Sequence, residues 1–136
     1  MTGVQTCALP ISAVTDMTRL PDEAIGLPAG FLQSGAAAVV GSLWAVNDFS
    51  TALVMARFYR NHLRGDPVAG EPPMPVARAL ARAQTWLRDA SAAELTAFAV
   101  EAGLLPAAAA AVPAGLARHP FADRPRHWAP FLLVGG

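Results

Sequence analysis

The segment at residues 36–50, AAAVVGSLWAVNDFS, decides the fold of this chain. Its first part, residues 37–43, is an uncharged run of small and β-branched residues, which is typical of a strand buried on both faces of a parallel sheet. The residues from Trp44 to Asp48 then predict a loop that leads directly into a helix. Because ligands bind outside the carboxyl ends of strands in open α/β sheets, we expect this loop to contact a substrate.

Helical patterns surround this strand in the sequence. A final apolar run, residues 128–135, predicts a second strand, and Pro130 near its start favours an edge position or a strand that begins just after it. The helix before the central strand enters it after a short turn at Gly35, so a βαβ crossover with a further strand upstream is expected, although no convincing strand pattern precedes it. We therefore predict an α/β fold, with helices packed on a small, mainly parallel sheet. A short helix is predicted to open at Leu20, and a second helical piece is predicted to begin at Pro28 and to end at Gly35. Further helices are predicted at residues 47–64, 76–90 and 91–101, the last with a capping box at Ser91 and Glu94.

The helix at residues 47–64 has two contrasting faces. Its N-cap is Asn47 or Asp48, and Gly65 ends it. We expect its first half, Thr51 to Ala56, which is apolar all round, to be buried deeply against the sheet. We expect the basic face to be solvated, with a basic docking surface as the alternative. The apolar face contains Ala52, Met55, Phe58, Tyr59 and Leu63, and the basic face contains Arg57, Arg60, Asn61 and Arg64.

Length and charge restrict the class of protein. The 136 residues suffice for one domain, and ten basic residues balance ten acidic ones, which argues against nucleic acid or an anionic membrane as a partner. The longest weakly polar run, residues 104–117, is interrupted by two prolines and is shorter than the ~20 residues of a membrane-spanning helix. No basic residue precedes Arg19, which argues against a secretory signal. The single cysteine, Cys7, excludes an internal disulfide and a cysteine-rich metal site. We therefore expect a cytoplasmic protein without a metal or cofactor.

Residues 1–12, MTGVQTCALPIS, do not fit the pattern of the remaining chain. They lack periodicity, and Pro10 interrupts their only apolar run. They resemble the conceptual translation of a sequencing-library adapter, and we interpret them as an artefactual leader joined to a truncated gene. A natural disordered leader is the alternative. On the first interpretation, Cys7 is not a nucleophile.

Two motifs in residues 13–135 resemble a known family. The first is Ser42-Leu43-Trp44-x-Val46-x-Asp48, and the second is His127-Trp128-Ala129-x-Phe131-x-Leu133-Val134-Gly135. Further matching residues are Asp22-Glu23, Gly26-Leu27, Phe31-Leu32, Gly35-Ala36, Val39-Val40, Ser50-Thr51, Phe58-Tyr59, Ala79-Leu80 and Ala83-Gln84. In this combination the residues resemble a CHAT domain, a caspase- and separase-like module typically found after tetratricopeptide repeats.

The resemblance implies a partial caspase-like sandwich and a peptidase-like chemistry whose key residues are missing. Family members resemble clan-CD cysteine peptidases, in which a histidine activates a cysteine thiolate. Residues 13–16, AVTD, resemble the end of the cysteine segment, which would place the family cysteine at Pro10. Cys7 lies three residues out of that register, and the histidine would lie on an earlier strand. Residues 13–136 are thus expected to be the C-terminal portion of one CHAT domain, with no catalytic residue.

The resemblance also implies a substrate-binding loop formed by Ser42, Leu43, Trp44 and Asp48. In separase relatives, the acidic residue of this motif is similar to one that binds a basic side chain before the cleaved bond. A carboxylate in a buried pocket would pair with arginine through two charge-assisted hydrogen bonds. Alternatively, Asp48 only caps the following helix. Trp44 either forms a wall of the pocket or belongs to the core.

Other catalytic and metal sites receive little support from the sequence. Ser42 could act as a nucleophile with His119 or His127 as base, but the segment lacks the second glycine of a nucleophile elbow. A metal site from His119, Asp123 and His127 lacks a recognised spacing. His62 is expected to be a core or boundary residue.

Two functions remain open at this point. The first is a CHAT-domain cysteine peptidase acting on protein or peptide substrates. This chain would contribute its substrate-binding loop, residues 42–48, which we call the pocket loop, and the parent protein would also contain an upstream repeat domain. The chain by itself is then expected to be inactive. The alternative is a non-catalytic CHAT-type module for protein interaction.

Overall fold

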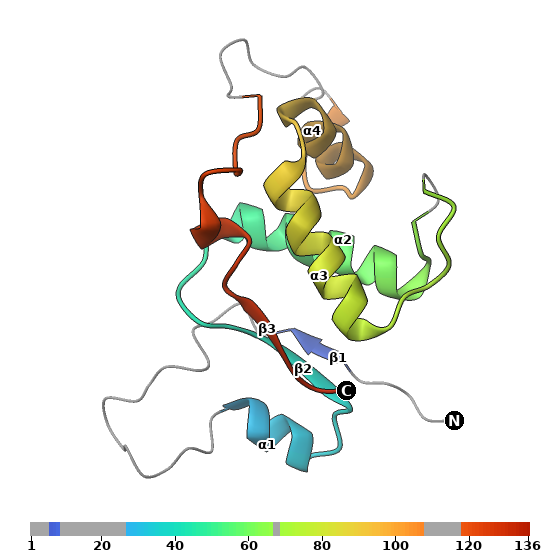
Figure 1. Cartoon of the computed structure of the whole chain (residues 1–136), viewed down its shortest axis with the longest axis vertical. Coiled ribbons are helices and arrows are strands. Elements are labelled where there is room, and N and C mark those ends of the chain that lie inside the picture. Colours follow the sequence, from blue (N-terminus) through green and yellow to red (C-terminus); the bar gives the residue numbers. More distant parts are fainter. Residues whose placement is uncertain (1–5, 9–26, 67–68, 108–117) are drawn as a thin grey trace.

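The computed structural model describes residues 6–8, 27–66, 69–107 and 118–136. Figure 1 shows their elements, which follow the predicted order of helices and strands. The start of the first predicted helix, the family-like segment at residues 13–16 and most of the run at residues 104–117 lie outside the described residues. The elements are β1 (Thr6–Ala8), α1 (Leu27–Gln33), β2 (Ala38–Ser42), α2 (Asp48–Leu63), α3 (Val76–Asp89), α4 (Ala92–Glu101), the short 3-10 helix η2 (Pro125–His127) and β3 (Phe131–Gly135).

The described strands form a mixed sheet in the order β1-β2-β3. β2 is buried along its whole length, as predicted. β1 runs parallel to β2, but the longer pairing, from Ala38↔Gly135 to Ser42↔Phe131, is antiparallel. The expectation of a mainly parallel sheet is therefore wrong for these strands. The physical reason is that β3 begins where β2 ends: Leu43 donates its backbone N–H to Pro130 O at 2.9 Å, so the chain must run back along β2.

β1 is the upstream parallel strand that the crossover pattern requires. It pairs in the register Thr6↔Ala38 to Ala8↔Val40, and it lies within the segment interpreted above as a leader. Sequence reasoning did not recognise this strand because three residues are too few to display an alternating pattern.

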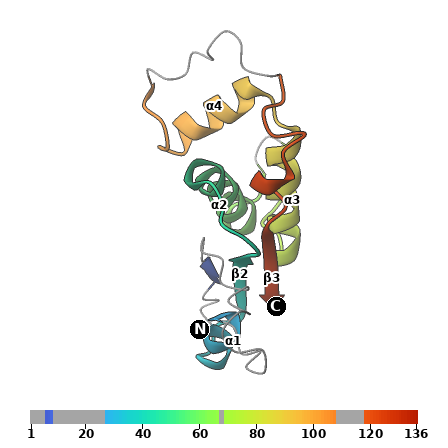
Figure 2. The ribbon, with the colours of Figure 1, turned by 90° about the vertical axis from the view of Figure 1, so that its left-hand side faces the viewer.

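Helices pack on both sides of this sheet. Figures 1 and 2 show α1 on one side, α2 and α3 on the other, and α4 beyond them, farthest from the sheet. The core between the sheet and α2, α3 and α4 is continuous and apolar, and its larger members are Val40, Leu53, Val54, Phe58, Leu80, Leu87, Leu95, Phe98 and Phe131. Within the described part of the chain, no helix has the length and apolar composition needed to cross a membrane.

The predicted helix boundaries are confirmed by their caps. Ser91 and Glu94 form the predicted capping box at the start of α4. Gly65 follows α2 with a φ of 78°, and a Cβ there would collide with the backbone of Glu71 and Pro72, so only glycine suits this turn. α2 therefore ends where the sequence predicts.

The first half of α2, Thr51 to Ala56, is buried or partly buried as predicted, but most of the basic face is not solvated, and only Arg64 at its end is exposed. The side chain of Arg57 is only 13% exposed and forms an ion pair with Asp66, which is 7% exposed. Its guanidinium lies over the rings of Trp86 and Phe98, at 5.3 and 5.7 Å from their centroids. Asn61 is completely buried. Aromatic side chains of α3 and α4 thus cover this face, an arrangement that no pattern within α2 could indicate.

By contrast, part of the predicted apolar face is exposed to solvent. Leu63 is 66% exposed, and Met55 and Tyr59 are only partly buried, whereas Phe58 is completely buried. At the C-terminal end of α2, Leu63 is therefore an exposed apolar side chain, whereas Met55 and Tyr59 pack against the core.

Candidate functional site

The loop between β2 and α2 carries the predicted substrate-binding residues at the carboxyl end of the central strand. Ser42 is completely buried as the last residue of β2. Leu43 and Trp44 are 37% and 40% exposed, and Asp48 is exposed on the first turn of α2. Three of the four predicted residues can therefore reach a ligand from solvent, and Ser42 cannot.

The cap of α2 is Asn47, and not Asp48. The Asn47 side chain accepts hydrogen bonds from the backbone N–H groups of Phe49 and Ser50, at 3.1 and 3.2 Å. The interpretation of Asp48 as the helix cap is therefore wrong. The expectation of a carboxylate in a buried pocket is wrong as well, because Asp48 is exposed. In the first turn, its negative charge is stabilised by the helix dipole.

Trp44 is fixed at the surface and is not a core residue. Its indole Nε1–H donates to Arg126 O at 3.3 Å, which joins the loop to the segment just before β3. One hydrogen bond and 40% exposure leave much of the ring accessible beside the loop.

A second connection between the same two segments passes through His127. Arg126 Nε donates to His127 Nε2 at 3.2 Å, so Nε2 must be the acceptor and the ring proton lies on Nδ1. His127 Nδ1 then donates to Ser50 Oγ at 3.0 Å, and Ser50 Oγ donates to Asn47 O at 3.1 Å. These bonds tie the C-terminal segment to the residue that caps α2. We call Trp44, Asn47, Ser50, Arg126 and His127 the loop clamp.

The loop clamp requires a neutral His127. Burial lowers the pKa of the imidazole, and the nearby charges of Arg126 and Arg124 lower it further. The ring also contacts Phe121, with centroids 4.9 Å apart. A protonated ring would place an N–H against the Arg126 donor, which would break the bond.

We expect acid to destabilise the folded chain through His127. Because its pKa in the folded chain is below the ordinary value of about 6.5, the unfolded chain binds more protons as the pH falls below that value. The contribution to stability is complete above pH ~6.5 and is lost as the pH falls toward the lower, folded pKa. His127→Asn, which keeps a donor toward Ser50, should therefore have a shallower pH dependence of unfolding free energy than the wild type between pH 7.5 and 5. Urea unfolding at several pH values measures this difference, and equal slopes would contradict the role of His127.

The structure does not assemble the alternative catalytic and metal sites that the sequence suggested. The serine that contacts His127 is Ser50 rather than Ser42, and Ser50 is completely buried, so this pair cannot reach a substrate. His119 instead contacts the carbonyl of Asp89 at 2.8 Å. Among the described residues, no group of three or more histidine, cysteine, aspartate or glutamate side chains is placed to hold a metal ion. His62 contacts Met74 O at 2.8 Å, as fits the expected boundary position.

Sequence reasoning missed the loop clamp. Ser50 and His127 are 77 positions apart, and Trp44 and Arg126 are 82 apart, so no local spacing connects them. The only available signal was that Trp44 and His127 belong to the two family-like motifs.

Comparison with known proteins gives one match. A family model described as the CHAT domain matches residues 11–136, a range that excludes Cys7 and β1. No curated protein and no solved structure matches the chain.

Proposed function

The chain belongs to the CHAT domain family, and on this premise we propose that it supplies the substrate-binding loop of a caspase-like cysteine peptidase domain. In this proposal, residues 13–136 form the C-terminal part of the sandwich and carry no catalytic residue. The observation that supports it best is an exposed carboxylate, Asp48, at the carboxyl end of a buried central strand, on a loop held by the loop clamp. Because the CHAT family is related to caspase-like peptidases, we propose a peptide as the ligand of this loop.

Asp48, Trp44 and Leu43 would bind a basic side chain of the substrate. The carboxylate would pair with a guanidinium or ammonium group, and the accessible indole of Trp44 would contribute a cation–π contact. Since Asp48 is exposed, its ion pair would contribute about 0.2–1 kcal/mol by itself, so the loop would select a charge rather than bind tightly. An upstream repeat domain of the parent protein would then provide further contacts to the substrate.

Neutralising Asp48 should remove this charge selection. We expect the wild type to bind a blocked arginine tripeptide about fivefold more tightly than its uncharged citrulline counterpart, and Asp48→Asn to bind both equally. NMR titration that follows the Trp44 indole N–H measures both affinities. Asp123→Asn, an exposed carboxylate outside the loop, is the matched control and should keep the preference. A preference for arginine that survives in Asp48→Asn would exclude Asp48 as the binding residue.

A hydrolysis assay with the purified chain tests whether it lacks a catalytic dyad. The purified chain should hydrolyse no peptide with arginine or lysine before the scissile bond. Turnover that is lost on Cys7→Ser would overturn the assignment of the dyad to other parts of the parent protein.

A non-catalytic interaction module is the second candidate function. It is favoured by three exposed large apolar side chains, Leu43, Trp44 and Phe49, which lie on the loop after β2 and on the first turn of α2. Protein binding through these residues without any preference for a basic side chain would support it over the peptidase.

A further inference from the structure

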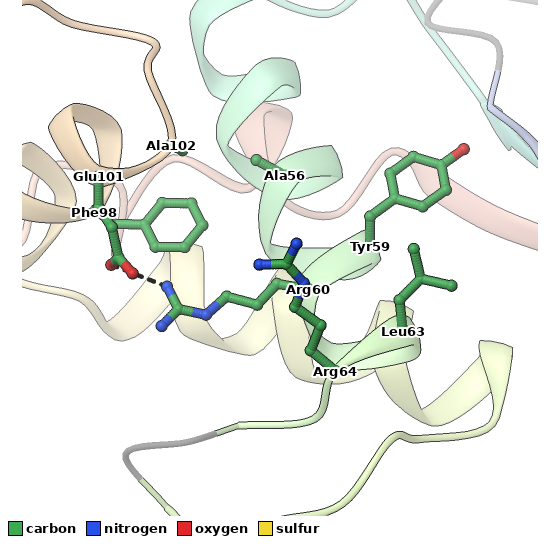
Figure 3. Close-up of a pocket in the computed structure, with 8 residues that line it drawn as sticks. All are labelled: Ala56, Tyr59, Arg60, Leu63, Arg64, Phe98, Glu101 and Ala102. Carbon is green, nitrogen blue, oxygen red and sulfur yellow. Dashed lines mark hydrogen bonds and ion pairs between the residues drawn. The ribbon is translucent and has the colours of Figure 1, made fainter.

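A second concave surface lies between α2 and α4, away from the pocket loop. It is a pocket of about 560 Å³ lined by residues from the C-terminal half of α2 and the last turn of α4. Figure 3 shows two guanidinium groups between Phe98 and Glu101 on one side and Tyr59 and Leu63 on the other. The pocket thus combines cationic groups with an aromatic and aliphatic wall.

Arg60 is already engaged within this pocket. It donates to Glu101 Oε2 at 2.9 Å and lies 5.6 Å from the ring centroid of Phe98. The charge of Glu101 is therefore balanced by Arg60, just as Asp66 balances Arg57 on the same aromatic ring. Arg60 therefore mainly organises the pocket.

In contrast to Arg60, Arg64 is available to bind a ligand. It is exposed one turn beyond Arg60, and within the described part of the chain its side chain has no hydrogen bond or ion pair. Next to it, Leu63 is 66% exposed, the most exposed of the large apolar residues described. An unpaired guanidinium therefore lies beside an unpacked aliphatic side chain. A ligand that carries both a carboxylate and an apolar group would complement this surface.

We propose that the α2–α4 pocket is a docking site for a partner protein, which inserts an acidic residue followed by a bulky apolar residue. The partner carboxylate pairs with Arg64, and its apolar side chain packs against Leu63 and Tyr59. A basic segment is disfavoured because the pocket has two arginines and one glutamate, and that glutamate is already paired. This inference is independent of the proposed function, since the pocket loop selects the opposite charge.

Three blocked peptides test the proposal on the chain of 136 residues. They are Ac-Glu-Leu-Glu-Phe-NH2, its uncharged form with glutamine, and its basic form with lysine. In NMR titrations we expect the acidic peptide to bind about fivefold more tightly than the glutamine peptide and to shift signals of Leu63 and Tyr59. The lysine peptide should bind most weakly.

Variants then locate the charge and the apolar contact. Arg64→Gln should lower the affinity for the acidic peptide to that for the glutamine peptide, and Leu63→Ala should weaken both. Arg78→Gln is the matched control, because Arg78 is an exposed arginine on α3 outside the pocket. Equal binding of the acidic and glutamine peptides, or an acidic preference that Arg64→Gln leaves intact, would overturn the proposal. Self-association of the chain that disappears in Leu63→Ala, without any preference for the acidic peptide, would instead assign the pocket to a second copy.

Discussion

Asp66→Asn is expected to lower the free energy of unfolding by about 3 kcal/mol, because it leaves the buried charge of Arg57 without a counter-ion. The two side chains form an ion pair at 2.5 Å, beneath Trp86 and Phe98. Burial lowers the pKa of the Arg57 guanidinium, and the Asp66 charge is the largest influence that opposes this shift. Asparagine retains an oxygen for the bond from Ala69 N–H, so the variant isolates the charge. Urea unfolding at pH 7 measures the loss.

Two further variants separate the cost of an unpaired charge from the value of the pair. Arg57→Met combined with Asp66→Asn should recover most of the loss, since methionine can fill the space between the rings without a charge. Glu101→Gln is the matched control: it breaks the ion pair with Arg60, but its side chain is 63% exposed, so it should cost less than about 1 kcal/mol. A loss in Asp66→Asn no larger than in Glu101→Gln would contradict the importance of the buried pair.

Phe58→Ala is expected to cost about 3–5 kcal/mol, which is the range for truncating a large aromatic residue in a packed core. Phe58 is completely buried at the centre of α2, with its ring 5.0 Å from that of Tyr59 and 6.0 Å from that of His62. Stabilities of small domains are about 5–15 kcal/mol, so this loss would remove a large share of the total.

Phe49→Ala, on the same helix, serves as the control for Phe58→Ala. Phe49 is 41% exposed, and its truncation should change the unfolding free energy by no more than about 0.5 kcal/mol. Similar losses in the two variants would mean that Phe58 is less tightly packed than its burial indicates.

Features that depend on neighbouring residues could be predicted from the sequence. β2 was found because an uncharged β-branched run needs burial on both faces, and α4 was found because Ser91 and Glu94 satisfy each other's backbone groups. Gly65 and Pro130 marked a helix end and a strand start for equally local reasons. The position of the loop between β2 and α2 could be predicted for the same reason, because it follows from the ends of the two neighbouring elements.

Features that depend on distant residues could not be predicted. The burial of Arg57 requires Asp66 beyond the helix and Trp86 on α3, so the helical pattern alone suggested solvation. The direction of β3 depends on where residues 118–130 bring the chain back, which no strand pattern encodes. Likewise, Asp48 and Asn47 are both good caps, and only the backbone geometry decided between them.

The loop clamp also determines when the loop after β2 acquires its shape during synthesis. Its contacts join residues 77 and 82 positions apart, whereas the helices and their caps require only local contacts. Contacts over such separations form slowly, because the entropy of a long loop must be lost first, and chains emerge from the ribosome with their N-terminus ahead. α2 and its Asn47 cap can therefore form early, whereas the contacts of Trp44 and Ser50 form only after Arg126 and His127 have been translated. The loop after β2 thus acquires its final shape later than the helix that follows it.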